Sequence, residues 1–430
     1  MSVKFKLSMV MLAVLATVGV AAYPLSIYIG KTIYEKELNK VLVTNRGVTL
    51  LSSEDGLTTK KDSFKYVHEG NDGRLSEFYF DVESEFGLTG VDSEIDLNFN
   101  QGTFAEVVSI LKHEGLQEVP DIDLHIGYKI WGDKIYANAS IDKAVISNPK
   151  YSCVSEGAKW NVSNSREASL GSYKTTTSML LDGIASGKYN ISIPLIECQA
   201  TDDLYIGSIK NVNFNGVLAG KTVSVIDWKI DNIKVKAQEE KVDLDLNDIY
   251  LKTELVKNDS NNTYGYGVQL VVKDSKVLAT EIVEDNKHQA INITDFNYHN
   301  LLVNLTPRQI EDYVKMSLEF YPNIADYNFG THADLILKDL SAKVNGNDLK
   351  VNGDVSVYLG NNPERVISES KGDINIKLSQ KIIELFGGQQ TVDNLVLFVE
   401  GGHINLENGI YSTKVSLKEG HIYLNDKRLF

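Results

Sequence analysis

The residues best suited to chemistry form two short acidic runs, one of which includes a histidine. In the first run Asp121, Asp123 and His125 alternate along the sequence. Alternate side chains of a β-strand point to the same face, so these three could offer carboxylate and imidazole ligands to one metal ion. The apolar residues between them favour a simpler interpretation, in which the run is the solvent face of a half-buried strand. We therefore predict no metal site here.

The second run is Asp243, Asp245 and Asp248. Carboxylate oxygens are preferred calcium ligands, but the run lacks the central glycine and the terminal glutamate of an EF-hand loop. Apolar residues again alternate with its first two members, which is typical of a strand with one wet face. This run too is predicted to be structural.

Longer catalytic signatures are missing from the chain. The sequence contains no HExxH, G-x-S-x-G, Walker or dinucleotide-binding pattern, and its 8 histidines are scattered. We predict a protein that is not an enzyme, with no catalytic, cofactor-binding or metal-binding residues and no cofactor. Acidic residues far apart in sequence can still meet in space, so a hydrolase acting on envelope polymers stays as an alternative.

The two cysteines, Cys153 and Cys198, are predicted to form a disulfide if the chain is exported. Such a bond would close a loop of about 45 residues and stabilise the fold by roughly 4 kcal/mol in the chain-entropy model. The alternative is a pair of buried free thiols.

Export is predicted from Leu7–Gly30, an uncharged and mostly apolar run preceded by Lys4 and Lys6 and followed by Lys31. As a helix rising roughly 1.5 Å per residue it would extend about 36 Å, enough for a hydrocarbon core of about 30 Å. The lysines before it favour a cytoplasmic amino terminus. A signal peptide cleaved after Ala22 is the alternative, but the apolar character continues beyond Ala22, which favours an uncleaved anchor.

Charge excludes one class of partner. The formal net charge is −15 at pH 7, and an acidic surface disfavours anionic partners, namely nucleic acid and strong binding to anionic lipid head groups. The expected partners are the membrane, through Leu7–Gly30, and a lipid or another envelope protein.

Beyond residue 45, alternation of apolar and polar residues dominates. It predicts strands with one buried face, and their close spacing favours an antiparallel meander. The expected fold is mainly β: a transmembrane helix, then a large antiparallel domain, or two β halves, with two or three covering helices. The clearest predicted strands are 77–86, 93–101, 121–130, 133–141, 223–237, 241–255, 265–274, 334–344, 354–360, 373–379, 394–402 and 410–420.

Turns and helices carry sharper local signals. Asn345-Gly346 and Asn352-Gly353 predict two-residue hairpin turns, because both central positions need positive φ. Capping boxes beginning at Thr103 and Thr306 predict helices to about His113 and Phe320. A third short helix is expected over 379–386.

The chain is expected to divide as follows: 1–6, cytoplasmic tail; 7–30, transmembrane signal anchor; 31–256, first part of a periplasmic β-rich domain; 257–267, linker or hairpin tip; 268–430, second β-rich part.

Three stretches resemble a bacterial family of unknown function, the YdgA/YihF-like proteins of the inner membrane. They are Tyr28–Lys31 with Glu35, which is similar to Y-x-G-K-K-x-E; Asp72–Ser76, which is similar to R-G-x-F-S before a strand; and Lys418–Lys427, which is similar to x-x-G-x-(I/L)-x-(L/V)-N-G-K. This chain departs from those patterns at Thr32, at the transposed Gly73-Arg74 and at Asp426. The resemblance implies an inner-membrane anchor and a periplasmic β-rich domain, and it supplies no catalytic residue.

Three functions are consistent with these observations. The first is a non-catalytic, membrane-anchored periplasmic protein that binds or scaffolds an envelope component. The second is a lipid-binding or lipid-transfer protein with a β-sheet groove. The third is the envelope-polymer hydrolase.

Overall fold

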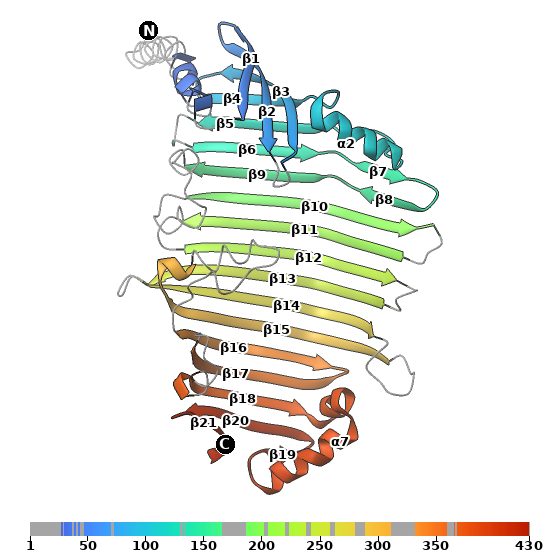
Figure 1. Ribbon diagram of the computed structural model, residues 1–430, viewed down its shortest axis with the longest axis vertical. Coiled ribbons are helices and arrows are strands. Elements are labelled where there is room, and N and C mark those ends of the chain that lie inside the picture. The colour runs from blue at the N-terminus through green and yellow to red at the C-terminus, as the bar shows by residue number, and fades with distance from the viewer. Residues whose placement is uncertain are drawn as a thin grey trace, which may run out of the picture. The chain divides into compact units, whose positions relative to one another are not determined.

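The computed structural model of the chain describes residues 27–28, 30–36, 38–39, 42–43, 47–69, 73–129, 132, 134–165, 186–201, 205–219, 223–237, 242–258, 263–279, 289–310, 332–358, 365 and 368–429. This part is mainly β and its strands pair antiparallel (Figure 1), as the alternation predicts. It divides into two compact units: residues 1–148, 154–172 and 187–191, and residues 149–153, 173–186 and 192–430.

The first unit is a meander in which strands β1 to β6 each pair with the next, and β6 then pairs with β9. Helix α2 (Gly102–His113) lies between β4 and β5 in the chain. The strands of this unit are β1 (Val48–Asp55), β2 (Thr59–Glu69), β3 (Leu75–Phe86), β4 (Gly90–Leu97), β5 (Ile122–Lys129), β6 (Lys134–Ile141), β7 (Ala144–Ser147) and β9 (Ala158–Ser165).

The second unit contains a meander from β11 to β18, in which each strand pairs with the next, and β18 then pairs with β20. Its strands are β11 (Tyr205–Ala219), β12 (Val223–Ala237), β13 (Val242–Asn258), β14 (Thr263–Ala279), β15 (Gln289–Leu305), β16 (His332–Val344), β17 (Asn347–Tyr358), β18 (Lys371–Ser379), β19 (Asn405–Glu407), β20 (Ile410–Lys418), β21 (His421–Leu424) and β22 (Lys427–Arg428). Strands β8 (Tyr151–Ser155) and β10 (Ser186–Ala200) contribute residues to both units.

Five long strands of the second unit share an irregularity. In each of β11 to β15 the alternation of apolar and polar residues is interrupted at two consecutive polar residues. In β12, for example, Asp231 and Asn232 lie between Ile230 and Ile233. Asn211, Asp248 and Asp295 have positive φ at these interruptions. One residue of each of the two paired strands is left out of the pairing there. Apolar residues still face apolar residues beyond the irregularity, because neighbouring strands change phase together.

Of the two predicted Asn-Gly turns, one is confirmed. Asn345 and Gly346 have φ of 47° and 76° and join β16 to β17. The prediction of a turn at Asn352-Gly353 is wrong: β17 runs through it, with Asn352 paired to Asn375 and Gly353 to Ile374. Strand β17 is paired with β16 on one side and with β18 on the other, and this pairing holds it extended. Gly353 allows the two backbones to come close, because a Cβ at this position would lie 2.1 Å from the Asp373 carbonyl oxygen of β18.

The predicted helix at Thr103 is confirmed as α2, but its capping box is not formed. Gln101 is the N-cap residue, and the Thr103 hydroxyl instead accepts a hydrogen bond from the Glu77 backbone N–H at 2.9 Å. The box at Thr306 is confirmed, since Gln309 accepts from the Thr306 N–H at 2.9 Å and donates its own N–H to the Thr306 hydroxyl at 3.3 Å. The predicted continuation of this helix beyond residue 310 lies outside the described residues.

The third predicted helix is longer than expected. Helix α7 (Gln380–Glu400) continues past the predicted end at Phe386 after a kink at Gly388, whose φ is 68°. The prediction of a strand over 394–402 is therefore wrong. Val392, Leu395 and Val399 recur with helical spacing, and Val392 is buried while the next two are half-buried. In the first half of the helix, Ile382 packs with Ile291 and Val344 against the sheet.

The predicted anchor Leu7–Gly30 lies outside the described residues except for positions 27, 28 and 30, which are helical. None of the helices that the structure describes is long and apolar enough to cross a membrane. Residues 30–36, hereafter the N-terminal helix, begin at the last residue of this run. The predicted linker, 257–267, lies at the β13–β14 hairpin inside the second unit, where Asn258 pairs with Thr263.

Candidate functional site

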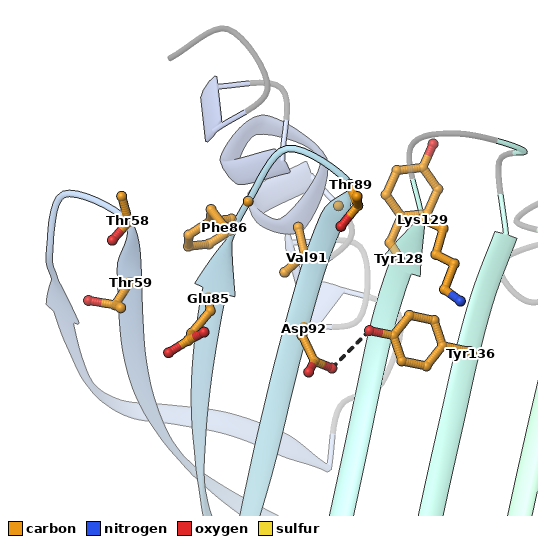
Figure 2. A pocket seen from close by; sticks show the side chains of 12 residues that line it. Thr58, Thr59, Glu85, Phe86, Thr89, Val91, Asp92, Tyr128, Lys129 and Tyr136 are labelled. Atoms are coloured by element: carbon orange, nitrogen blue, oxygen red, sulfur yellow. Dashed lines mark hydrogen bonds between the residues drawn. The ribbon is translucent and has the colours of Figure 1, made fainter. Parts of the chain in front are cut away.

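A pocket of about 350 Å³ opens at one end of the first unit, where β2 begins, β3 ends and β4 begins (Figure 2). Four of its lining residues, Thr59 on β2, Glu85 on β3, Asp92 on β4 and Tyr136 on β6, belong to one row of directly opposite residues. Between Asp92 and Tyr136 this row passes through Gly127 on β5. Residues directly opposite in antiparallel strands share a face of the sheet. The row therefore sets two carboxylates beside each other and a phenol within reach of them.

Gly127 explains how Tyr136 reaches into the row. A Cβ at position 127 would lie 2.2 Å from the Tyr136 Cζ atom, so only glycine lets the ring lie over β5. The phenol then donates a hydrogen bond of 2.9 Å to the Asp92 carboxylate (Figure 2). Burial, and then this hydrogen bond, raise the pKa of Tyr136 to about 12, which keeps the phenol protonated as a donor.

Glu85 and Asp92 bring two carboxylates to the lining of the pocket. Like charges directly opposite in a sheet repel. The Asp92 carboxylate accepts the Tyr136 hydrogen bond, and the Nδ1 atom of His125 lies 3.7 Å from it. Lys129 contributes a cation whose Nζ lies 5.1 Å from the centre of the Tyr136 ring. The arrangement can bind a polar ligand, and two neighbouring carboxylates are also the minimum requirement for acid–base hydrolysis of a glycoside.

The N-terminal helix is fixed beside this pocket by polar contacts. The Tyr34 hydroxyl donates a 2.7 Å hydrogen bond to Asp62, a carboxylate on β2 with 0% exposure. Burial, followed by the neighbouring Asp62, raises the pKa of Tyr34 above its usual range. The second Asp62 oxygen has no hydrogen-bond partner among the described residues, so this site depends strongly on Tyr34.

Lys31 makes a second attachment at the start of the same helix. Its ammonium donates to the Gly56 carbonyl at 2.7 Å and lies 3.4 Å from Asp55. It also lies 5.6 Å from the centre of the Phe86 ring. Gly30 is buried, and a Cβ there would lie 3.2 Å from Val91 and 3.3 Å from Phe86. The residues that end the uncharged run thus pack on the rim of the pocket.

The structure does not gather the acidic runs into a metal site. His125 Nε2 contacts Asp123 at 2.8 Å. Asp245 accepts a 2.7 Å hydrogen bond from Asn232, and Asp248 pairs with Lys273 at 3.4 Å. Across the described ranges, no three His, Cys, Asp or Glu side chains form a group that could hold a metal ion.

The predicted disulfide is confirmed. Cys153 on β8 and Cys198 on β10 are bonded, with Cα atoms 4.1 Å apart. The Thr201 N–H donates to the Lys150 carbonyl at 2.9 Å, so backbone pairing holds the two strands together beside the bond.

Sequence reasoning missed the pocket row. Glu85 lies on the predicted strand 77–86 and Asp92 just before the predicted strand 93–101, and pairing them requires the β3–β4 register. Gly127, inside a predicted strand, was the available signal, because a glycine there often marks a close approach. Comparison of the chain with family models, with curated proteins and with solved structures gave no match.

Proposed function

We propose that this chain is a single-pass protein of the bacterial inner membrane whose β-rich part lies in the periplasm and binds or scaffolds an envelope component without catalysis. Residues 1–6 would be cytoplasmic and Leu7–Gly30 would be the membrane anchor. The uncharged run and the lysines before it support this topology, as does the resemblance to the YdgA/YihF-like family. The Cys153–Cys198 disulfide agrees with an oxidising compartment.

The observation that carries the proposal is the attachment of the N-terminal helix. A cleaved signal peptide would leave the helix-to-sheet contacts of Gly30 and Lys31 only a few residues from a free amino terminus. Lys31, Tyr34 and the buried Asp62 connect the end of the apolar run to the β-sheet through hydrogen bonds. Such a connection suits a domain that is held at a defined position on a membrane.

The test measures topology on the full chain in bacterial cells. We expect the protein to resist extraction from membranes by alkaline carbonate, and alkaline phosphatase fused after Phe430 to be active. Mass spectrometry of the mature protein should find residues 1–22. A mature protein that begins at Tyr23, or a fusion that is inactive while its product accumulates, would overturn the anchored periplasmic topology.

A second candidate function, lipid binding, is favoured by one row of large side chains in the second unit. Phe214, Trp228, Leu251, Leu270 and Tyr298 lie opposite one another across β11 to β15, and each is half-buried. The Phe214 and Trp228 rings are 4.6 Å apart. A continuous apolar row of this kind is the surface that an acyl chain requires.

This candidate is tested by photo-crosslinking in cells. Benzoylphenylalanine at Trp228 should yield phospholipid adducts detectable by mass spectrometry. The same group at Tyr250 is the matched control, because Tyr250 is opposite Lys229, the next residue of β12, and so lies on the other face. Equal adduct formation at both positions, or none at Trp228, would argue against a lipid-binding face.

A hydrolase would use Glu85 and Asp92 as its two catalytic carboxylates, because they line the pocket and lie opposite each other. If this alternative is correct, the full chain should release soluble products from purified envelope polysaccharide, and E85Q and D92N should each abolish the release. Undiminished release by both variants, or the absence of release by the unaltered chain, would remove this mechanism.

A further inference from the structure

Two neighbouring hairpins of the first unit end in the same tripeptide, Gly-Leu-Thr. The β1–β2 turn contains Leu57 and the β3–β4 turn contains Leu88. Leu57 is 90% exposed and Leu88 is 47% exposed. Turns are usually built from polar residues and glycine. Single exposed apolar residues are common on protein surfaces, but here the same exposed leucine recurs at two turns that lie side by side.

The backbone holds these two turns together. The Phe86 N–H donates to the Thr58 carbonyl at 2.8 Å, which joins the end of β3 to the β1–β2 turn. Each turn is closed by its own hydrogen bond, Gly56 N–H to Thr59 and Gly87 N–H to Gly90, both at 2.9 Å. The two leucines are therefore presented from one rigid edge of the sheet.

The end of the uncharged run lies at the same edge. Lys31 binds the Gly56 carbonyl beside Leu57, and Gly30 packs on Phe86 two residues before Leu88. If Leu7–Gly30 is embedded in a bilayer, the membrane surface must begin close to these two turns. The residues next to the leucines are glycine and threonine, so no charge within either tripeptide opposes entry into the interface.

We propose that the two Gly-Leu-Thr turns, here called the leucine turns (residues 56–58 and 87–89), insert Leu57 and Leu88 into the surface of the phospholipid bilayer that holds the anchor. This inference rests on the proposed membrane anchor. The leucine turns give the first unit a second contact with the bilayer, which fixes its tilt and sets the pocket, lined by Thr58 and Thr89, at the level of the lipid headgroups.

Leu75 is a matched control at the far end of the same sheet. It is 64% exposed and begins β3, whereas Phe86 ends it. At about 3.3 Å per residue, the two ends of this strand are roughly 35 Å apart. A probe at position 75 therefore reports an exposed leucine that should stay in water.

The experiment uses the full chain reconstituted in vesicles of phosphatidylethanolamine and phosphatidylglycerol. L57C, L88C and L75C are each labelled with a polarity-sensitive fluorophore, while the native cysteines are protected by their disulfide. We expect blue-shifted emission, quenching by spin-labelled lipid and protection from iodide at positions 57 and 88. Position 75 should show unshifted emission and quenching by iodide.

The outcomes separate the two proposals. If the protein floats with the vesicles but positions 57 and 88 behave like position 75, the leucine turns do not insert, although the anchor stands. If the protein does not float with the vesicles, the anchor fails and this inference fails with it. Lipid quenching at all three positions would also overturn it, because the contact would then not be specific to the leucine turns.

Discussion

The Tyr136 hydroxyl on β6 donates a hydrogen bond to Asp92 on β4, and the tyrosine ring passes over the backbone of Gly127 on β5. This relationship predicts the effect of Gly127→Ala. The new methyl group would displace the Tyr136 ring and break the hydrogen bond, so the pKa of Tyr136 should fall from about 12 towards its ordinary 10.0. NMR titration of ring-labelled tyrosine measures this change.

The sign of the accompanying pH effect also follows. Because the folded-state pKa of Tyr136 is raised, its contribution to stability is complete below pH 10.0 and is lost as the pH rises towards about 12. Gly127→Ala should remove part of that decline. A resonance that still titrates near pH 12 in the variant would contradict the proposed role of Gly127.

Tyr34→Phe should weaken the attachment of the N-terminal helix to the sheet. The substitution leaves Asp62, which has 0% exposure, without its Tyr34 hydrogen bond. The expected loss is about 1–3 kcal/mol in the free energy of unfolding, because a buried acceptor loses its partner. Urea unfolding of the full chain in detergent measures the loss.

Tyr66→Phe is the control for that variant. Tyr66 stacks on Phe78 at 6.0 Å, and its ring is retained in the variant. The change should stay within about 0.5 kcal/mol. Equal effects of the two substitutions would show that the Asp62 contact does not hold the helix.

Replacing the glycine of each Asn-Gly pair with alanine should lower the free energy of unfolding by different amounts. At Gly346, with φ of 76° and open space around the Cβ position, the cost is conformational strain of about 1–2 kcal/mol. At Gly353 a Cβ would lie 2.1 Å from the Asp373 carbonyl oxygen, so Gly353→Ala should destabilise more than Gly346→Ala. Comparing their urea midpoints tests this order, and the reverse order would contradict the β17–β18 approach.

Ser416→Ala should alter acid stability. Ser416, with 0% exposure, is the main cause of the lowered pKa of Asp373, and Lys414 is the second. A lowered carboxyl pKa stabilises the fold above the ordinary value of 3.8, and this stabilisation is lost as the pH falls below it. Ser416→Ala should therefore cost about 1 kcal/mol at pH 7, since Asp373 is partly solvated.

The same variant should lose less at acid pH than at pH 7, because the Asp373 carboxylate becomes protonated as the pH falls below 3.8, and it does so at a higher pH in the variant than in the unaltered protein. Ser412→Ala, in the same strand and opposite Lys377, is the control and should show no such pH dependence. Urea unfolding at pH 7 and pH 3 provides the comparison. A cost of Ser416→Ala that is equal at both values would exclude the Asp373 contact as its origin.

Removal of the Cys153–Cys198 disulfide should lower the free energy of unfolding by about 2–4 kcal/mol, because the unfolded chain regains the entropy of an open loop. Reductant should destabilise the unaltered chain by a similar amount. It should have no effect on the C153S/C198S variant. A protein whose stability does not respond to reductant would show that the bond contributes nothing under those conditions.

Much of the fold follows from local patterns. A capping box beginning at Thr103 predicted the helix that became α2, although the box itself is not formed. Alternation predicted the strand over 223–237 at the bounds of β12. It failed at 394–402, where an apolar run was assigned to a strand, because a short run does not distinguish the two periods. The Asn-Gly turn signal was wrong at Asn352-Gly353, because β17 is paired with a strand on each side there and stays extended.

The sequence by itself determined the mainly β character, the disulfide partners and the uncharged run, because each depends on the types of residues near one another in the chain or on a count of two cysteines. Only the tertiary structure decided which residues meet. The pairing of Glu85 with Asp92 and the passage of Tyr136 over Gly127 depend on strand register, and the packing of Gly30 on Phe86 and Val91 depends on where the N-terminal helix lies on the sheet. Register is a property of paired strands, and shifting it by one residue moves every side chain to the other face.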